Sequence, residues 1–86
     1  MSVTWKTNAL YYEEGTTLAT KAYVNLTDDV TGAATDKVYA IDSSTASGYN
    51  AETCSDADVV AMVKTSLGPT AVANAEGAVT QKVRFF

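Results

Sequence analysis

The side chains that most often carry out enzymatic chemistry are sparse in this sequence. Histidine is absent, which removes the commonest general base and the commonest metal ligand. The single cysteine, Cys54, precedes an expected helix whose dipole favours a thiolate, but the acids Asp56 and Asp58 beside it act against that charge. We interpret Cys54 as an unreactive, half-buried residue. No glycine-rich phosphate-binding motif occurs, so we expect no catalytic residue and predict that the protein is not an enzyme.

Carboxylates form two groups that could in principle serve as cation-binding or acid–base sites. Asp28, Asp29 and Asp36 flank one loop, and their oxygens could gather around a hard cation. Their spacing matches no calcium loop, and we interpret them as a solvated turn. The pair Glu13–Glu14 is interpreted as a charged hairpin tip. A general acid–base pair needs a cleft that raises one pKa, which so small a chain rarely builds, so we expect no metal and no cofactor.

The overall charge argues against several classes of partner. The 86 residues carry a net charge of −4, and the six basic residues are scattered along the chain. Such a chain lacks the basic footprint that supplies most nucleic-acid affinity. No apolar run approaches the length of about 18 residues that a membrane-spanning helix needs. We therefore expect neither nucleic-acid nor membrane binding, and one cysteine provides no internal disulfide.

Aromatic side chains are the remaining candidates for function. Tyrosine and tryptophan combine a large contact area with a polar tip and are enriched at protein interfaces. Two interpretations stay open: these side chains stand on an uncovered sheet face, or they belong to the core and its edge. On simple strand alternation, Trp5 and Tyr11 share one face of the first strand. The candidate interface residues are Trp5, Tyr11, Tyr12, Tyr23, Tyr39, Phe85 and Phe86.

The first half of the chain is typical of strands. Residues 3–13 and 17–27 alternate apolar and polar side chains on either side of a turn at Gly15, which predicts a hairpin. Strand alternation in the second run places Leu18, Ala22, Val24 and Leu26 on one face and Ala19 with Tyr23 on the other. A third strand is expected over residues 37–43. Together these runs predict a three-stranded antiparallel meander.

The second half changes to a helical period. Ser55 or Thr53 is expected to cap a helix that ends at Gly68, and Pro69 then opens a second helix. Within that second helix, Gly77 either serves a close contact or weakens the helix. We predict an α+β fold in which the meander packs against a C-terminal pair of short helices. Residues 1–86 form one domain, which is strand-rich over 1–43, a loop over 44–53 and helical over 54–86.

Part of the chain resembles a known group of proteins. The helix ending in Val63–Gly68 has the pattern V-K-x-x-L-G, a tryptophan, Trp5, lies near the start of the strand-rich half, and the second helix carries Glu76. This combination is similar to small uncharacterised proteins encoded by tailed phages, especially marine ones. The resemblance implies a phage protein, encoded near virion genes, with no known catalytic residues.

These observations lead to two hypotheses of function. The first is a phage structural or accessory protein that acts by protein–protein contacts, as a capsid decoration or a tail-associated subunit. Its partner is another copy of itself or a capsid or tail protein, and it is homo-oligomeric or bound to the shell of the virion. The alternative is a small acidic phage protein that binds and modulates a host protein in the host cytoplasm, for which the acidic charge suits a basic target.

Overall fold

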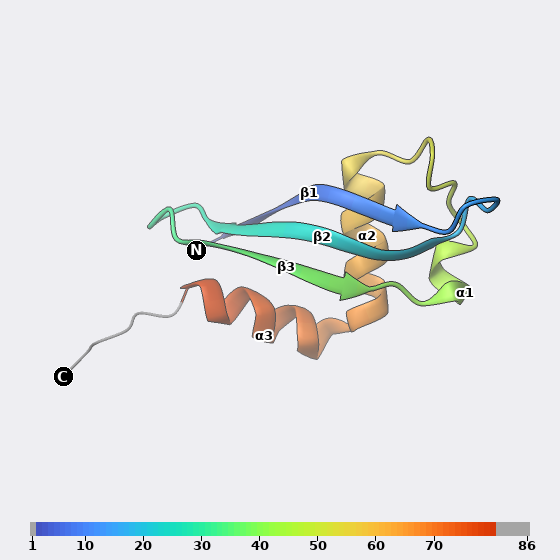
Figure 1. The fold of residues 1–86 in the computed structure, drawn as a ribbon. Helices are drawn as coiled ribbons and strands as arrows, with labels where there is room; N and C mark the ends of the chain where they lie inside the picture. The colour runs from blue at the N-terminus through green and yellow to red at the C-terminus, as the bar shows by residue number, and fades with distance from the viewer. Residues whose placement is uncertain (1, 81–86) are drawn as a thin grey trace.

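The computed structural model describes residues 2–80 and has an α+β fold. It confirms the predicted antiparallel meander, with strand order β1-β2-β3, followed by C-terminal helices (Figure 1). The elements are β1 (Val3–Tyr12), β2 (Ala19–Asp28), β3 (Ala34–Ala40), α1 (Ser43–Ala46), α2 (Asp56–Leu67) and α3 (Pro69–Thr80).

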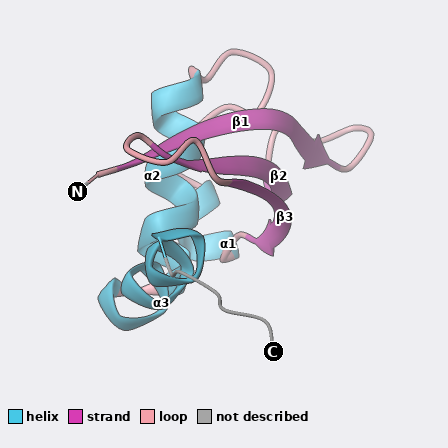
Figure 2. Ribbon diagram, turned by 90° about the vertical axis from the view of Figure 1, so that its left-hand side faces the viewer, coloured by secondary structure: helices cyan, strands magenta, loops and turns pink. Residues whose placement is uncertain are grey.

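The helices cover one face of the sheet. α2 crosses the strands and α3 runs along them, both on the same side (Figures 1 and 2). The core lies between these layers, where Val24 and Leu26 of β2 and Met62 and Val63 of α2 are completely buried. Burying each such side chain contributes about 1.5–3 kcal/mol. The central strand therefore holds the helical layer in place.

Local sequence signals set the ends of the two long helices. Ser55, one of the two predicted caps, accepts a hydrogen bond from the backbone N–H of Asp58, whose carboxylate in turn accepts one from the N–H of Ser55. This capping box satisfies two backbone donors at the start of α2. Gly68 ends α2 with a φ of 83°, a conformation that favours glycine. Pro69 then begins α3 directly, so the chain turns a corner there.

The predicted loop over 44–53 is wrong at its start, because residues 43–46 form the short helix α1. The carbonyl of Asp42 accepts hydrogen bonds from the N–H groups of Thr45 and Ala46, and Ala46 is fully buried in the core. A single turn is too short to show a helical period in the sequence. The third strand also begins earlier than predicted, at Ala34, and ends at Ala40.

Two bulges in the hairpin change which side chains face the helices. Between Thr7 and Ala9, the extra residue Asn8 has no partner on β2, and a second irregularity opposite Tyr11 and Tyr12 leaves Thr20 unpaired. An inserted residue reverses the alternation that follows it. The prediction that Trp5 and Tyr11 share a face is therefore wrong.

The second bulge has the same effect on β2. Ala19, expected on the face opposite Ala22, Val24 and Leu26, is instead buried on their side with an exposed fraction of 3%. Leu18, expected to share their face, is exposed. The alternation of Ala22, Val24 and Leu26, which lie beyond this bulge, is as predicted. The strand pattern is thus reliable between bulges and fails across them.

Gly77 offers a test of how α3 is stabilised. A Cβ added at this exposed helical position meets nothing within 4 Å, so no close contact requires glycine. We expect Gly77→Ala to raise the free energy of unfolding by about 0.5–1 kcal/mol, because alanine loses less backbone entropy in a helix. Urea denaturation followed by circular dichroism measures the change. Gly68→Ala is the matched control and should destabilise, because its φ is positive; a destabilising Gly77→Ala would contradict this account.

Candidate functional site

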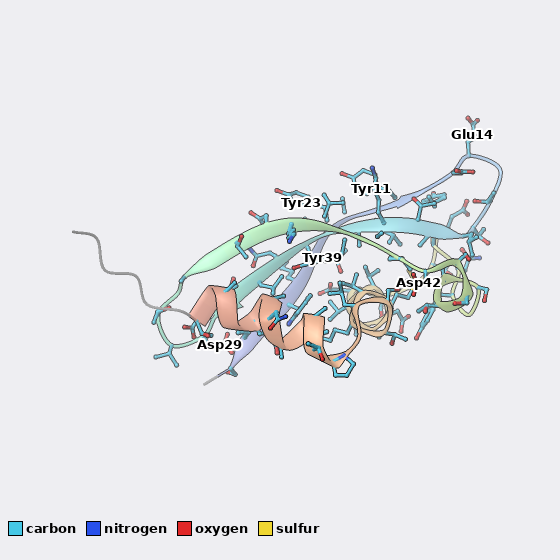
Figure 3. The ribbon with its side chains drawn as sticks, turned by 90° about the horizontal axis from the view of Figure 1, so that it is seen from below. Tyr11, Glu14, Tyr23, Asp29, Tyr39 and Asp42 are labelled. Carbon is cyan, nitrogen blue, oxygen red and sulfur yellow. The ribbon has the colours of Figure 1, made fainter. Side chains whose placement is uncertain are left out.

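The face of the sheet opposite the helices is uncovered. Strand register and burial assign it the residues Thr4, Lys6, Asn8, Ala9, Tyr11, Lys21, Tyr23, Asn25, Thr27, Ala34, Asp36, Val38 and Ala40, which we call the open face. Tyr11 and Tyr23 point away from the helices (Figure 3). Tyr11 is 42% exposed and Val38 is 47% exposed, and the Lys21 ammonium lies 5.1 Å from the centre of the Tyr11 ring. Two of the seven candidate interface residues therefore share this face.

A hydrogen-bond network crosses the open face from strand to strand. One carboxylate oxygen of Asp36 accepts from the side-chain amides of Asn8, at 2.9 Å, and Asn25, at 3.0 Å. Thr27 donates to the amide oxygen of Asn25 at 2.7 Å. These bonds join all three strands and fix the polar half of the face. The bulged Asn8 thus ties the first strand to the third.

Trp5 lies in the core, which corrects its place among the exposed candidates. It is 8% exposed on the helix-covered face. Its indole N–H donates to the Glu76 carboxylate at 2.8 Å, and the Lys64 ammonium lies 5.2 Å from the centre of its ring. Buried tryptophan needs such a partner for its N–H. Trp5 therefore joins β1 to α2 and α3 instead of facing solvent.

Tyr39 also lies on the helix-covered side (Figure 3). It is half-buried, its ring centre is 6.1 Å from that of Trp5, and the Lys37 ammonium is 5.4 Å from its centre. Burial raises the pKa of the Tyr39 hydroxyl. Tyr39 consequently packs against the edge of the core and is not part of the open face.

The remaining candidates lie elsewhere. Tyr12 is 42% exposed at the last position of β1, directly after Tyr11. It borders an open hollow lined by Tyr12, Glu14, Gly15, Thr16, Thr17 and Glu52. Phe85 and Phe86 lie outside the described residues. The structure thus does not bring the five described candidates together as one surface.

The three aspartates near the β2–β3 turn are engaged separately, and their interpretation as a solvated turn is wrong for Asp28, which ends β2 and is buried, and for Asp36, which lies within β3. Asp28 is buried and accepts from the Val30 N–H and the Thr31 hydroxyl, each at 3.0 Å, while Asp29 accepts from Ser2 and Thr4. Within residues 2–80, no group of three or more potential metal ligands comes together. The turn is stabilised by these local bonds. Cys54 is half-buried, as interpreted from the sequence.

A groove of about 460 Å³ lies between β3 and α3, and it was not predicted from the sequence. α3 runs beside β3 in the opposite direction (Figure 1). The groove is lined by Thr35, Lys37, Tyr39, Leu67, Ala71, Asn74, Ala75 and Ala78. The sequence signal was the row of alanines on one side of the second helix, which leaves space beside the strand. The position of that helix depends on the Gly68 corner and is not readable from local pattern.

No protein-family model, curated protein or solved structure matches this chain. Among the described helices, none is long and apolar enough to cross a membrane.

The Trp5–Glu76 bond yields a stability prediction. Glu76→Ala leaves the indole N–H without its partner, so we expect the free energy of unfolding to fall by about 1–2 kcal/mol. Urea denaturation followed by tryptophan fluorescence measures this. Glu14→Ala is the matched control, since it removes the same charge from the exposed hairpin tip and should change stability little. Equal effects of the two substitutions would contradict a specific role for Glu76.

Asp29 yields a pH prediction. Hydrogen bonds from Ser2 and then Thr4 lower the pKa of this exposed carboxyl, against a small opposing effect of desolvation. A lowered pKa in the folded state means that the stabilising contribution is present above the unfolded pKa and is lost as pH falls through the folded one. Carboxyl NMR titration should give Asp29 a pKa below that of an ordinary aspartate. The Ser2→Ala substitution should raise this pKa, and an unchanged pKa in that variant would contradict the assigned cause.

Proposed function

We propose that this chain is a non-enzymatic protein–protein interaction subunit of a bacteriophage, used as a capsid decoration or a tail-associated component of the virion. The phage assignment rests on the sequence resemblance around Val63–Gly68. The mode of action rests on one observation, which is that the helices leave the open face of the sheet uncovered.

The chemistry of the open face suits contact with protein. Tyr11, Tyr23 and Val38 supply adjacent apolar area, because the register places Val38 opposite Tyr23 and Lys21 opposite Tyr11 on neighbouring strands. Tyrosine adds contact area at a low cost in side-chain entropy. The neighbouring polar groups around Asp36 already bond to one another, so a partner covering them leaves few unsatisfied groups.

The shape of the open face favours a broad, flat contact with a partner over insertion into a deep pocket. A pleated sheet face presents a broad, shallow surface on which side chains stand roughly perpendicular. A second copy of the open face, or a flat region of a shell protein, is the partner we propose.

The prediction concerns the two tyrosines. We expect Tyr11→Ser with Tyr23→Ser to weaken self-association or shell binding about tenfold or more, because buried tyrosines are frequent energetic centres of interfaces. Light scattering behind a sizing column at two concentrations measures self-association, and co-sedimentation with purified particles measures shell binding. Tyr11 and Tyr23 both point away from the helix-covered core, so the double variant should still fold.

The control is Tyr49→Ser, which removes an exposed tyrosine in the loop after α1, away from the open face. It should leave association unchanged. A wild-type protein that is monomeric at both concentrations and absent from purified particles would contradict the proposed function. Equal losses in the control and the double variant would instead contradict the choice of surface.

A further inference from the structure

The outer edge of β3 presents free backbone hydrogen-bonding groups. The N–H of Ile41 bonds to the carbonyl of Thr20, and the N–H of Asp28 bonds to the carbonyl of Ala33. In an antiparallel pair such bonds alternate along the strand, so the odd-numbered residues of β3 bond to β2. The even-numbered residues direct their backbone groups outward, and they are Ala34, Asp36, Val38 and Ala40. Within residues 2–80 these groups have no hydrogen-bond partner outside the sheet.

The other edge of the sheet is protected. On β1 the backbone N–H of Thr7 donates to the Asp56 carboxylate at 2.7 Å, so the start of α2 occupies an outward-facing donor. The bulge at Asn8 interrupts the same edge. Capping groups and bulges are the usual means by which proteins prevent edge pairing. In the described structure β3 has neither of these two devices. Its inward charge, Lys37, discourages pairing with apolar strands but leaves the edge able to accept a strand of opposite charge.

The β3–α3 groove runs along this free edge. Its walls are the inward side chains of β3 and the small side chains Ala71, Ala75 and Ala78 of α3. An added strand would therefore bond to the β3 backbone and place alternate side chains against the helix. This is the geometry by which domains bind extended peptides through strand addition.

The charge of the groove points to the kind of strand. Among the described residues that line it, Lys37 alone is charged. Lys37 is exposed, and on the inner side of β3 it stands between Thr35 and Tyr39. Residues opposite one another on antiparallel strands interact directly, and opposite charges there are favourable. An acidic residue opposite Lys37, with an apolar residue opposite Tyr39, matches the groove.

We propose that the β3–α3 groove binds an extended segment of a partner protein that adds as a strand to β3 and places an acidic side chain against Lys37. The inference extends the proposed function, since it gives an interaction subunit a second contact, but it stands on residues separate from Tyr11 and Tyr23. A second copy of β3 is a poorer occupant. It would bring a second Lys37 into the groove, where like charges on neighbouring strands oppose pairing.

The experiment selects peptides from a displayed library of random heptapeptides on the immobilised full-length chain. We expect enrichment of alternating sequences with aspartate or glutamate near the centre. A selected peptide is then synthesised with its acidic residue and with lysine in its place, and both are titrated by fluorescence anisotropy. The acidic form should bind about three- to tenfold more tightly, and Lys37→Glu should reverse that preference.

Two controls separate this surface from the others. Lys21→Glu makes the same charge change on the open face and should leave the preference unaltered, and Lys37→Gln should remove it without reversal. Amide NMR should show the bound peptide slowing hydrogen exchange at Ala34, Asp36, Val38 and Ala40. Exchange protection at β1 instead of β3, or the same peptides selected by Lys37→Glu, would overturn the proposal.

The test also distinguishes this inference from the proposed function. Peptide binding that is unaffected by Tyr11→Ser with Tyr23→Ser supports the groove even if open-face association fails. Dimerisation that protects the β3 amides without peptide would make a second copy the occupant. Peptide binding that appears only after residues 81–86 are removed would make the chain's own end the occupant. Either of the last two results would overturn the proposed partner.

Discussion

The whole structure depends on the contact between the central strand and one crossing helix. Met62 and Val63 of α2 are completely buried against the inward side chains of β2, among them Val24 and Leu26. Within residues 2–80, the two longest helices have twelve residues each, and both lie on this side of the sheet. A two-layer domain of this size has apolar cover for one sheet face. Exposure of the other face follows directly, and with it the exposure of Tyr11 and Val38.

The elements that local chemistry determines were predictable from the sequence. The alternation placed Ala22, Val24 and Leu26 on one face of β2, which is the buried face in the structure. The cap at Ser55 or Thr53 and the Gly68–Pro69 corner indicated where the helices begin and end. Each of these signals acts within a few residues, so tertiary packing does not override it. The fold class followed because three strands and two helices of these lengths have few ways to bury their apolar faces.

The composition of the candidate site was less predictable, because it depends on single inserted residues. Asn8 and Thr20 each shift the pairing by one position, and a one-residue shift moves every later side chain to the other face. Trp5 and Tyr11, which share a face by simple counting, are therefore separated into core and surface. An asparagine inside a strand was the available sign of the first bulge, but only its bond to Asp36 across the sheet explains its position.

The two sheet edges differ for reasons that lie far apart in the sequence. Asp56 reaches the β1 edge because the capping box at Ser55 begins α2 beside that strand. At the opposite end of α2, the positive φ of Gly68 directs α3 back along β3, and the alanines of α3 keep it from filling the space beside the strand. One helix thus closes the first edge at its start and, through the corner at its end, leaves the third strand open beside a groove. Lys37 gives the open third strand selectivity. Its inward charge discourages pairing with apolar strands, and it favours a strand that carries a carboxylate at the matching position.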